Sequence, residues 1–323
     1  MKYRLFKLAL GIAAVLALSG ALAQQYPSKP VRMIVAFPPG GGVDLTGRVL
    51  AKKLGEIWGQ PVVVENKPGA TATIGANAVV LGGEDGYTLL VTNNALAISA
   101  GLYATLPYDP LKDLKPISTV LATPFVLVVP ADAKAANLGE FLQAVKAKPG
   151  NVSYASTGIG SGPHLAMIVL MQMSGISMNH VPYKGGGQAI PDVIAGRVQA
   201  FLTTPLAAMP HVQAGKLRAL GVTSAERMKE FPAIPTIAEA GVPGYDVQTW
   251  YMVLAAGKAP DAVVRKVHDD IVTALKDPAV QKPLQGDGAT LIGSTPAQAR
   301  ELLARDLERW KKVITQAGVK PTD

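Results

Sequence analysis

The chain has 323 residues, of which 49% are hydrophobic and 17% are charged, and it contains no cysteine. At about 150 residues per domain, this length predicts two domains, and the composition is typical of a globular protein. The lack of cysteine excludes disulfides, thiolate metal sites, a cysteine nucleophile and a lipid anchor on cysteine.

The first 23 residues have the pattern of a secretory signal peptide. Basic residues Lys2, Arg4 and Lys7 precede an apolar stretch, and Ala21 and Ala23 provide the small residues of a cleavage site. The apolar stretch is shorter than the ~20 residues that cross a bilayer, which argues against a membrane anchor. We therefore expect cleavage after Ala23.

Cleavage would leave a mildly basic protein. Three basic residues and no acidic residue are removed, so the formal net charge falls from +8 to +5. A weak positive field suits small anions, but the basic residues do not form the stripe that nucleic-acid binding needs. We expect no nucleic-acid partner.

Strand and helix signals alternate in the first part of the mature chain. The apolar run 31–37 reads as a buried strand that ends in the glycine-rich loop 38–42, and a helix with Asp44 as N-cap then runs to Gly59. Strands at 61–65 and 87–91 flank a helix at 74–81. This alternation predicts a parallel sheet covered by helices on both faces.

A second unit with the same alternation starts at Pro124. Its predicted strands are 124–129, 152–155 and 198–202, and its predicted helices are 138–147, 164–173 and one that ends at 194. After 217–222 the chain returns to the first unit. It closes with a long amphipathic helix that has Thr295 as N-cap and Gly318 as its stop.

Three glycine-rich turns, at 38–42, 156–162 and 183–187, lead from predicted strands into predicted helices. Helix N-termini expose unpaired N–H groups and can hold an anion without a charged side chain. Each turn alone could be an ordinary connection, but three at strand ends favour a ligand site. None completes a phosphate-loop or dinucleotide motif, so we expect no phosphate-bearing cofactor.

Catalytic and metal motifs are missing from the sequence. The four histidines, which lack close metal-ligand spacing, are His164, His180, His211 and His268. Around Ser161, the positions that a nucleophile elbow reserves for glycine hold Ile159 and Pro163. We expect neither an enzyme nor a metal site, and His164 is either a local helix cap or a ligand contact.

Several short motifs are spread along the mature chain: Tyr26-Pro27-Ser28-Lys29-Pro30, Phe37-Pro38-Pro39-Gly40-Gly41-Gly42-x-Asp44, Val64-Glu65-Asn66-Lys67-Pro68-Gly69-Ala70, Asp85-Gly86-Tyr87-Thr88-Leu89-Leu90, Leu106-Pro107-Tyr108-Asp109-Pro110, Tyr154-Ala155-Ser156, His180-Val181-Pro182-Tyr183-Lys184-Gly185 and Ala240-Gly241-x-Pro243-Gly244-Tyr245. In combination, these motifs resemble the Bug (Bordetella uptake gene) family, the periplasmic substrate-binding components of tripartite tricarboxylate transporters. The resemblance covers essentially the whole mature chain.

This resemblance implies an α/β fold of the type II periplasmic-binding class, with two lobes that close over a small carboxylate in a cleft between them. The lobes would be 24–123 plus 224–323, and 124–223. The protein would be a periplasmic monomer that delivers its ligand to integral membrane subunits. The implied ligand-binding residues are Pro39, Gly40, Gly41, Gly42, Thr92, Asn93 and Asn94 in one lobe, and Ser156, Thr157, Gly160, Ser161, His164 and Gly185 in the other.

One departure from the family pattern bears on the ligand. Many members carry Asp where this chain has Thr203, and an aspartate there suits an ammonium group. With Thr203 in the site, we expect a dicarboxylate, hydroxy acid or aromatic acid rather than an amino acid. The alternatives are a secreted enzyme of small organic acids and a ligand-sensing adaptor for a sensor kinase.

Overall fold

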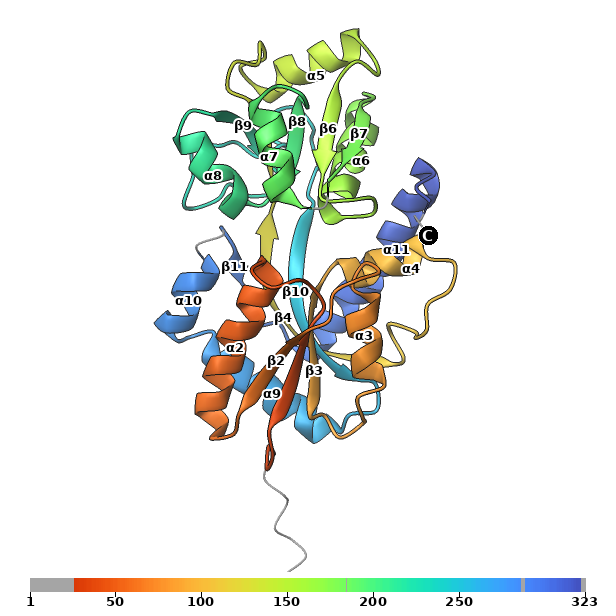
Figure 1. Ribbon diagram of the computed structural model, residues 1–323, viewed down its shortest axis with the longest axis vertical. Coiled ribbons are helices and arrows are strands. Elements are labelled where there is room, and N and C mark those ends of the chain that lie inside the picture. Colours follow the sequence, from red (N-terminus) through yellow and green to blue (C-terminus); the bar gives the residue numbers. More distant parts are fainter. Residues whose placement is uncertain (1–25, 184, 286–287, 321–323) are drawn as a thin grey trace, which may run out of the picture.

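The computed structural model describes residues 26–183, 185–285 and 288–320. Two helix-flanked sheets lie one above the other, and extended strands pass between them (Figure 1). The predicted signal peptide and its cleavage site lie outside the described residues. Within these ranges, no helix combines the length and the apolar character that a bilayer crossing requires.

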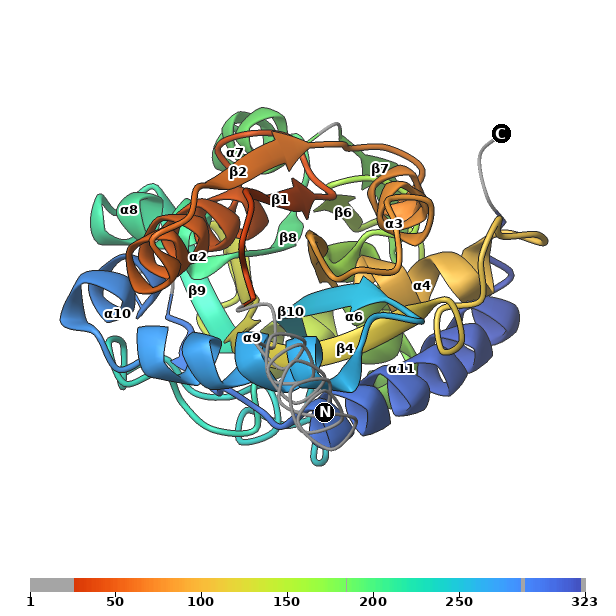
Figure 2. The same ribbon diagram turned by 90° about the horizontal axis from the view of Figure 1, so that it is seen from below.

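The first sheet has six strands in the order β11-β4-β10-β3-β1-β2. Its strands are β1 (Val31–Val35), β2 (Val62–Asn66), β3 (Thr88–Asn93), β4 (Leu114–Pro124), β10 (Gln248–Ala256) and β11 (Thr290–Leu291). Its helices are α2 (Gly42–Trp58), α3 (Thr73–Val80), α4 (Ala95–Leu102), α9 (Asp261–Ala274), α10 (Pro278–Gln285) and α11 (Pro296–Ala317). Helices α2, α9 and α10 pack together on one face, and α3, α4 and α11 lie on the other (Figure 2).

The second sheet has five strands in the order β7-β6-β8-β5-β9. Its strands are β5 (Val126–Pro130), β6 (Ser153–Ser156), β7 (Asn179–Pro182), β8 (Ala200–Thr203) and β9 (Leu217–Val222). Its helices are α5 (Leu138–Ala147), α6 (Gly162–Ser174), α7 (Gly186–Ile194) and α8 (Pro205–Gln213).

Both sheets are mixed, so the prediction of a parallel sheet is only partly right. The pairs β1–β2, β1–β3, β6–β7 and β6–β8 are parallel. Strands β10 and β5 are antiparallel to both of their neighbours. The antiparallel strands are those that link the sheets: β4 continues through Phe125 into β5, and β10 follows the return segment 223–247. Because β4 leaves the first sheet towards the second unit and β10 re-enters it from there, the two strands run in opposite directions.

The C-terminal helix α11 forms as the sequence predicts. Thr295 accepts a hydrogen bond from the Gln298 amide and completes a capping box, and Gly318 ends the helix at φ 63°. Its apolar stripe is buried at Leu303, Trp310 and Ile314. Because α11 packs on α4, β4 and α6, it touches elements of both sheet units.

Candidate functional site

The loop 38–41 is held in place by Asp44, whose predicted role as N-cap is wrong. The N-cap of α2 is Gly41, and Asp44 lies in the first helical turn. Its carboxylate turns back and accepts a hydrogen bond of 2.9 Å from the Gly40 amide. Because Gly41 is extended and the helix begins before Asp44, the Asp44 carboxylate does not cap the helix and bonds to the loop amide of Gly40.

The Asp44 carboxylate is the centre of a hydrogen-bond network. Asn66 Nδ2 donates to Asp44 Oδ1 at 2.8 Å and to the Phe37 carbonyl at 2.9 Å, and Arg48 Nε donates to Asp44 Oδ2 at 2.9 Å. Burial alone would raise the pKa of the Asp44 carboxyl, but the hydrogen bonds from Arg48, Gly40 and Asn66 bring it below its usual value. Asp44 is therefore ionised at neutral pH and fixes the shape of the loop.

The junction between β3 and α4 presents unpaired polar atoms. Asn94 is 2% exposed, and its Oδ1 accepts a hydrogen bond of 2.9 Å from Thr249 Oγ1. Among the described residues, neither Asn94 Nδ2 nor Thr92 Oγ1 has a hydrogen-bond partner. Asn93 differs, because its Oδ1 accepts from the Ala95 amide at 2.9 Å. Leaving a buried amide donor without an acceptor costs free energy. Such donors are typical of sites where a ligand or a water molecule supplies the missing acceptor.

The turn 156–162 leads into α6. The helix begins at Gly162, two residues before the predicted start, and Ser161 is its N-cap. Ser161 Oγ accepts from the His164 amide at 3.4 Å, and its carbonyl accepts from the Leu165 amide. Since Pro163 carries no N–H, the Gly162 amide is the donor of this first turn that finds no partner within the described parts of the chain.

The two sheet units meet where this turn approaches the β3–α4 junction. A Cβ on Gly162 would lie 3.7 Å from Asn94 Nδ2. A Cβ on Gly160, whose φ is +72°, would lie 2.5 Å from Leu102 Cδ2 of α4. Glycine is therefore required at Gly160 both for its backbone conformation and for the close approach. Asn94 Nδ2 therefore lies beside the first residue of α6, with the Phe125 ring 3.1 Å from the same Cβ position.

A second helix N-terminus lies at the ends of β6 and β8. Gly185 is the N-cap of α7, and its carbonyl accepts from the amides of Gln188 and Ala189. A Cβ on Gly186 would lie 3.5 Å from Thr203 Oγ1, so the buried Thr203 side chain faces the start of α7. The carboxylate of α7, Asp192, accepts hydrogen bonds from Tyr183 and Arg197.

The remaining predicted residues differ in exposure. Pro39, Gly40 and Gly41 are exposed, Thr157 is half-buried, and Ser156 is fully buried. The loop 38–42 reaches the β3–α4 junction through Tyr251: a Cβ on Gly42 would lie 2.5 Å from Tyr251 Oη, and Tyr251 pairs with Asn93 in the sheet.

Sequence reasoning missed Thr249 and His180 as parts of this region. Thr249 reaches it from β10, a strand that the sequence analysis did not predict. His180 lies on β7, and its Nε2 is 2.6 Å from Ser156 Oγ. Only the sheet pairing brings these side chains to residues far away in the sequence, and no local pattern signals it.

His164 and His180 are both neutral near pH 7. Their rings stack with centroids 3.9 Å apart and planes 13° from parallel. Burial lowers the pKa of His164 to about 3, with a smaller contribution from His180, and burial lowers the pKa of His180 to about 4. The histidines therefore act through neutral hydrogen bonds rather than as cations.

Acidification from pH 6.5 towards 4 is expected to lower the free energy of unfolding. Unfolded histidine titrates near pH 6.5, whereas folded His164 and His180 titrate near 3 and 4. In this window the unfolded chain binds more protons, so stability that is present above pH 6.5 is lost as the pH falls, by at most about 1.4 kcal/mol per pH unit per histidine. Urea titrations at several pH values measure the slope.

The matched control for this pH series is the double variant His164→Asn/His180→Gln, which should flatten the slope between pH 6.5 and 4.5. Burial raises the pKa of Asp306, whose contribution has the opposite sign and is common to both proteins. An identical slope in the two proteins would contradict the neutral state of the two histidines.

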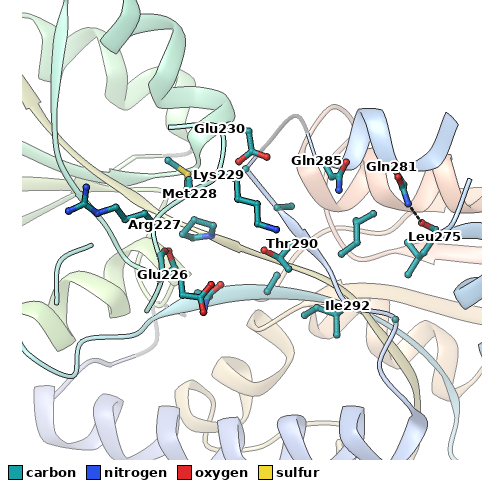
Figure 3. A pocket seen from close by; sticks show the side chains of 18 of the residues that line it. Glu226, Arg227, Met228, Lys229, Glu230, Leu275, Gln281, Gln285, Thr290 and Ile292 are labelled. Carbon is teal, nitrogen blue, oxygen red and sulfur yellow. Dashed lines mark hydrogen bonds between the residues drawn. The ribbon is translucent and has the colours of Figure 1, made fainter. Parts of the chain in front are cut away.

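A separate pocket of about 720 Å³ lies beside the crossing strands (Figure 3). It is lined by the return segment at 224–230 and by parts of α9, α10 and β11. Apolar Leu275 and Ile292 and charged Glu226 and Lys229 contribute to it, but none of the predicted ligand-binding residues does. This pocket therefore does not overlap the predicted ligand-binding residues. No group of His, Asp and Glu side chains in the described ranges could hold a metal ion.

Known proteins with similar sequences include members named Bug. Protein BugT of Bordetella pertussis is 38% identical over 312 residues, which cover 96% of this chain and 94% of BugT. The solved structure of periplasmic binding protein BugD superposes with a TM-score of 0.80 at 30% identity, over 92% of this chain and 100% of BugD.

Two further solved structures contain small dicarboxylates. A protein of R. palustris with adipate has a TM-score of 0.82 at 30% identity, over 92% of this chain and 100% of its own. MatC from Rhodopseudomonas palustris, with bound malate, has a TM-score of 0.78 at 28% identity, over 90% of this chain and 100% of its own. The fold is that of the periplasmic binding proteins, as the sequence predicted.

The family model described as "Tripartite tricarboxylate transporter family receptor" matches residues 46–319. Members of this family, the TctC or Bug proteins, are periplasmic solute-binding proteins and not enzymes. The resemblance to Bug proteins read from the sequence motifs is therefore confirmed. On this match and on its identity to BugT, the chain belongs to the tripartite tricarboxylate transporter receptor family.

Proposed function

We propose that this protein captures a small organic carboxylate in the periplasm and delivers it to the integral membrane subunits of a tripartite tricarboxylate transporter. The observation that carries the proposal is the meeting of Asn94 Nδ2, buried and without a partner in the described chain, with the open N-terminus of α6 at Gly162. Neutral amide donors and helix N-termini bind a carboxylate directionally without a buried counter-charge that would hinder release.

The proposed lobes are residues 24–123 plus 224–323, and residues 124–223. Residues from both would contact the ligand, so the closed arrangement would bind it better than the open one. A ligand shifts such an equilibrium only through this difference in affinity. The closed protein would be the form that the membrane subunits recognise.

The proposed ligand is a dicarboxylate, hydroxy acid or aromatic acid without an amino group. Support comes from Thr203, a buried hydroxyl that faces the start of α7. The similar proteins solved with adipate and malate point to the same chemical class. A carboxylate at Thr203 would repel a second acid group and attract an ammonium group.

A thermal-shift screen of mono-, di- and tricarboxylates, aromatic acids and amino acids tests this proposal. A ligand at 100 times its dissociation constant stabilises the folded protein by about 2.7 kcal/mol. We expect stabilisation by carboxylates and none by aspartate or glutamate, with calorimetry to confirm the hits. Tight binding of the amino acids without binding of plain diacids would contradict the ligand class, and no response to any acid would contradict the function.

Two substitutions at Thr203 sharpen the screen. Thr203→Asp should weaken binding of the best diacid at least about tenfold, because it adds a like charge to a buried position. Thr203→Val has nearly the same shape without the charge and should retain most of the affinity. Equal losses in both variants would mean that packing, rather than charge, matters at this position.

A further inference from the structure

A buried histidine, His164, and a half-buried one, His180, flank the turn that forms the proposed anion site. His164 lies in the first turns of α6, and His180 lies on β7. Their rings stack at 3.9 Å, and the ring of Tyr154 lies 5.1 Å from His180 and 6.3 Å from His164. This cluster of rings sits beside the turn 156–162 and contacts it at both ends.

His164 holds the turn through one defined ring nitrogen. The Gly160 amide donates a hydrogen bond of 3.0 Å to His164 Nδ1. Nδ1 must therefore be unprotonated, and the proton of the neutral ring lies on Nε2. Gly160 is buried and packs against Leu102 of α4, so this bond fixes the part of the turn that meets the first sheet unit.

His180 contacts the first residue of the turn, Ser156, through its ring nitrogen Nε2. Ser156 Oγ lies 2.6 Å from His180 Nε2 and 3.0 Å from the Gly158 carbonyl oxygen, and it accepts from the Gly158 amide at 3.1 Å. The direction of the bond between Ser156 and His180 Nε2 follows the tautomer of His180, and Nε2 is the ring nitrogen that makes it in either case. Ser156 is fully buried, so its hydroxyl serves the turn and not the solvent-facing side of the site.

We propose that His164 and His180 are positioning residues for ligand binding: His164 through Nδ1 and His180 through Nε2 fix the turn 156–162, and with it the Gly162 amide at the N-terminus of α6. This inference rests on the proposed function, since it assigns how the carboxylate site is held in shape. Stacking would orient both rings, and each hydrogen bond would hold one end of the turn.

Amide side chains that mimic one ring nitrogen at a time test this assignment. The Oδ1 of asparagine takes the place of histidine Nδ1, and the terminal group of glutamine takes the place of Nε2. We expect His164→Asn to bind the best carboxylate of the screen nearly as the wild type does, and His164→Gln to bind it about tenfold more weakly. At His180 the order reverses, with Gln retaining affinity and Asn losing it.

All four variants lose the ring stack, so each pair is its own control for packing. A purely structural role would lower affinity equally in Asn and Gln at a given position, which would overturn the proposal. Circular dichroism and thermal melts check that the four proteins are folded to the same extent. The affinities come from calorimetry at one pH near neutrality.

Amide hydrogen exchange without ligand separates this inference from the proposed function. The Gly160 amide should stay protected from exchange in His164→Asn and lose protection in His164→Gln. The Gly158 amide should stay protected in His180→Gln and lose protection in His180→Asn. If the wild type binds no carboxylate, the proposed function fails and the inference fails with it. If the wild type binds a carboxylate but Asn and Gln at the same position give equal affinities, only the positioning role is overturned. This holds even if hydrogen exchange shows that the hydrogen bonds exist.

Discussion

Replacing Asn94 by Leu together with Thr249 by Val is expected to weaken carboxylate binding by about 10- to 100-fold and to leave the free energy of unfolding unchanged or higher. The loss in affinity corresponds to one hydrogen bond to a charged ligand, about 1.5 to 3 kcal/mol. The gain in stability would come from removing a buried donor that has no partner within the described chain. Calorimetry measures the first quantity and urea unfolding the second.

The double substitution is needed because Thr249 Oγ1 donates to Asn94 Oδ1 at 2.9 Å. Removing only one of the two would leave the other buried and unsatisfied. A matched control is Thr119→Val, since Thr119 Oγ1 is also buried and without a partner among the described residues, but lies on β4 outside the proposed site. Thr119→Val should not alter affinity. If it weakens binding as much as the double variant does, Asn94 has no special role.

Replacing Asp44 by Ala is expected to lower the free energy of unfolding by about 2 to 3 kcal/mol and to weaken carboxylate binding as well. The Asp44 side chain is 5% exposed and accepts hydrogen bonds from Gly40, Arg48 and Asn66. Removing one partner of a buried charged network costs about 3 to 5 kcal/mol, and the half-exposed Arg48 reduces this figure. Denaturant unfolding measures the loss.

The control for Asp44 is Asp261→Ala. Both residues are acids in the first turn of a helix and both pair with a cation, but the Asp261 side chain is 72% exposed beside Lys115. Replacing Asp261 should leave stability nearly unchanged, because solvent screens an exposed pair. Equal effects in the two variants would show that the helix dipole, and not the buried network under the loop, accounts for the stabilisation.

Local sequence signals correctly predicted the helix ends that are set by residues a few positions apart. The capping box at Thr295 and the glycine stops at Gly59 and Gly318 are as expected, because caps form between residues only a few positions apart. The start of α2 was misjudged at Asp44. There a glycine took the cap position, and the carboxylate bonded to a loop amide behind it.

Long-range pairing was harder to infer. The two longest strands, β4 and β10, went unpredicted: both are buried on two faces and lack a polar alternation, and Pro116 breaks the strand pattern within β4. These strands link the two sheets, and β10 makes the first sheet mixed. Thr249 reaches the candidate site from β10, so it was missed with that strand.

The amino-acid sequence by itself was enough to indicate the family, the periplasmic-binding fold and glycine turns suited to an anion, because these depend on short motifs and on the alternation of strands and helices. Which donors are left unpaired was decided by the tertiary structure alone. Asn94 and Gly162 are far apart in the chain, as are Ser156 and His180, and their hydrogen-bonding state depends on partners that only the packed sheets bring within reach.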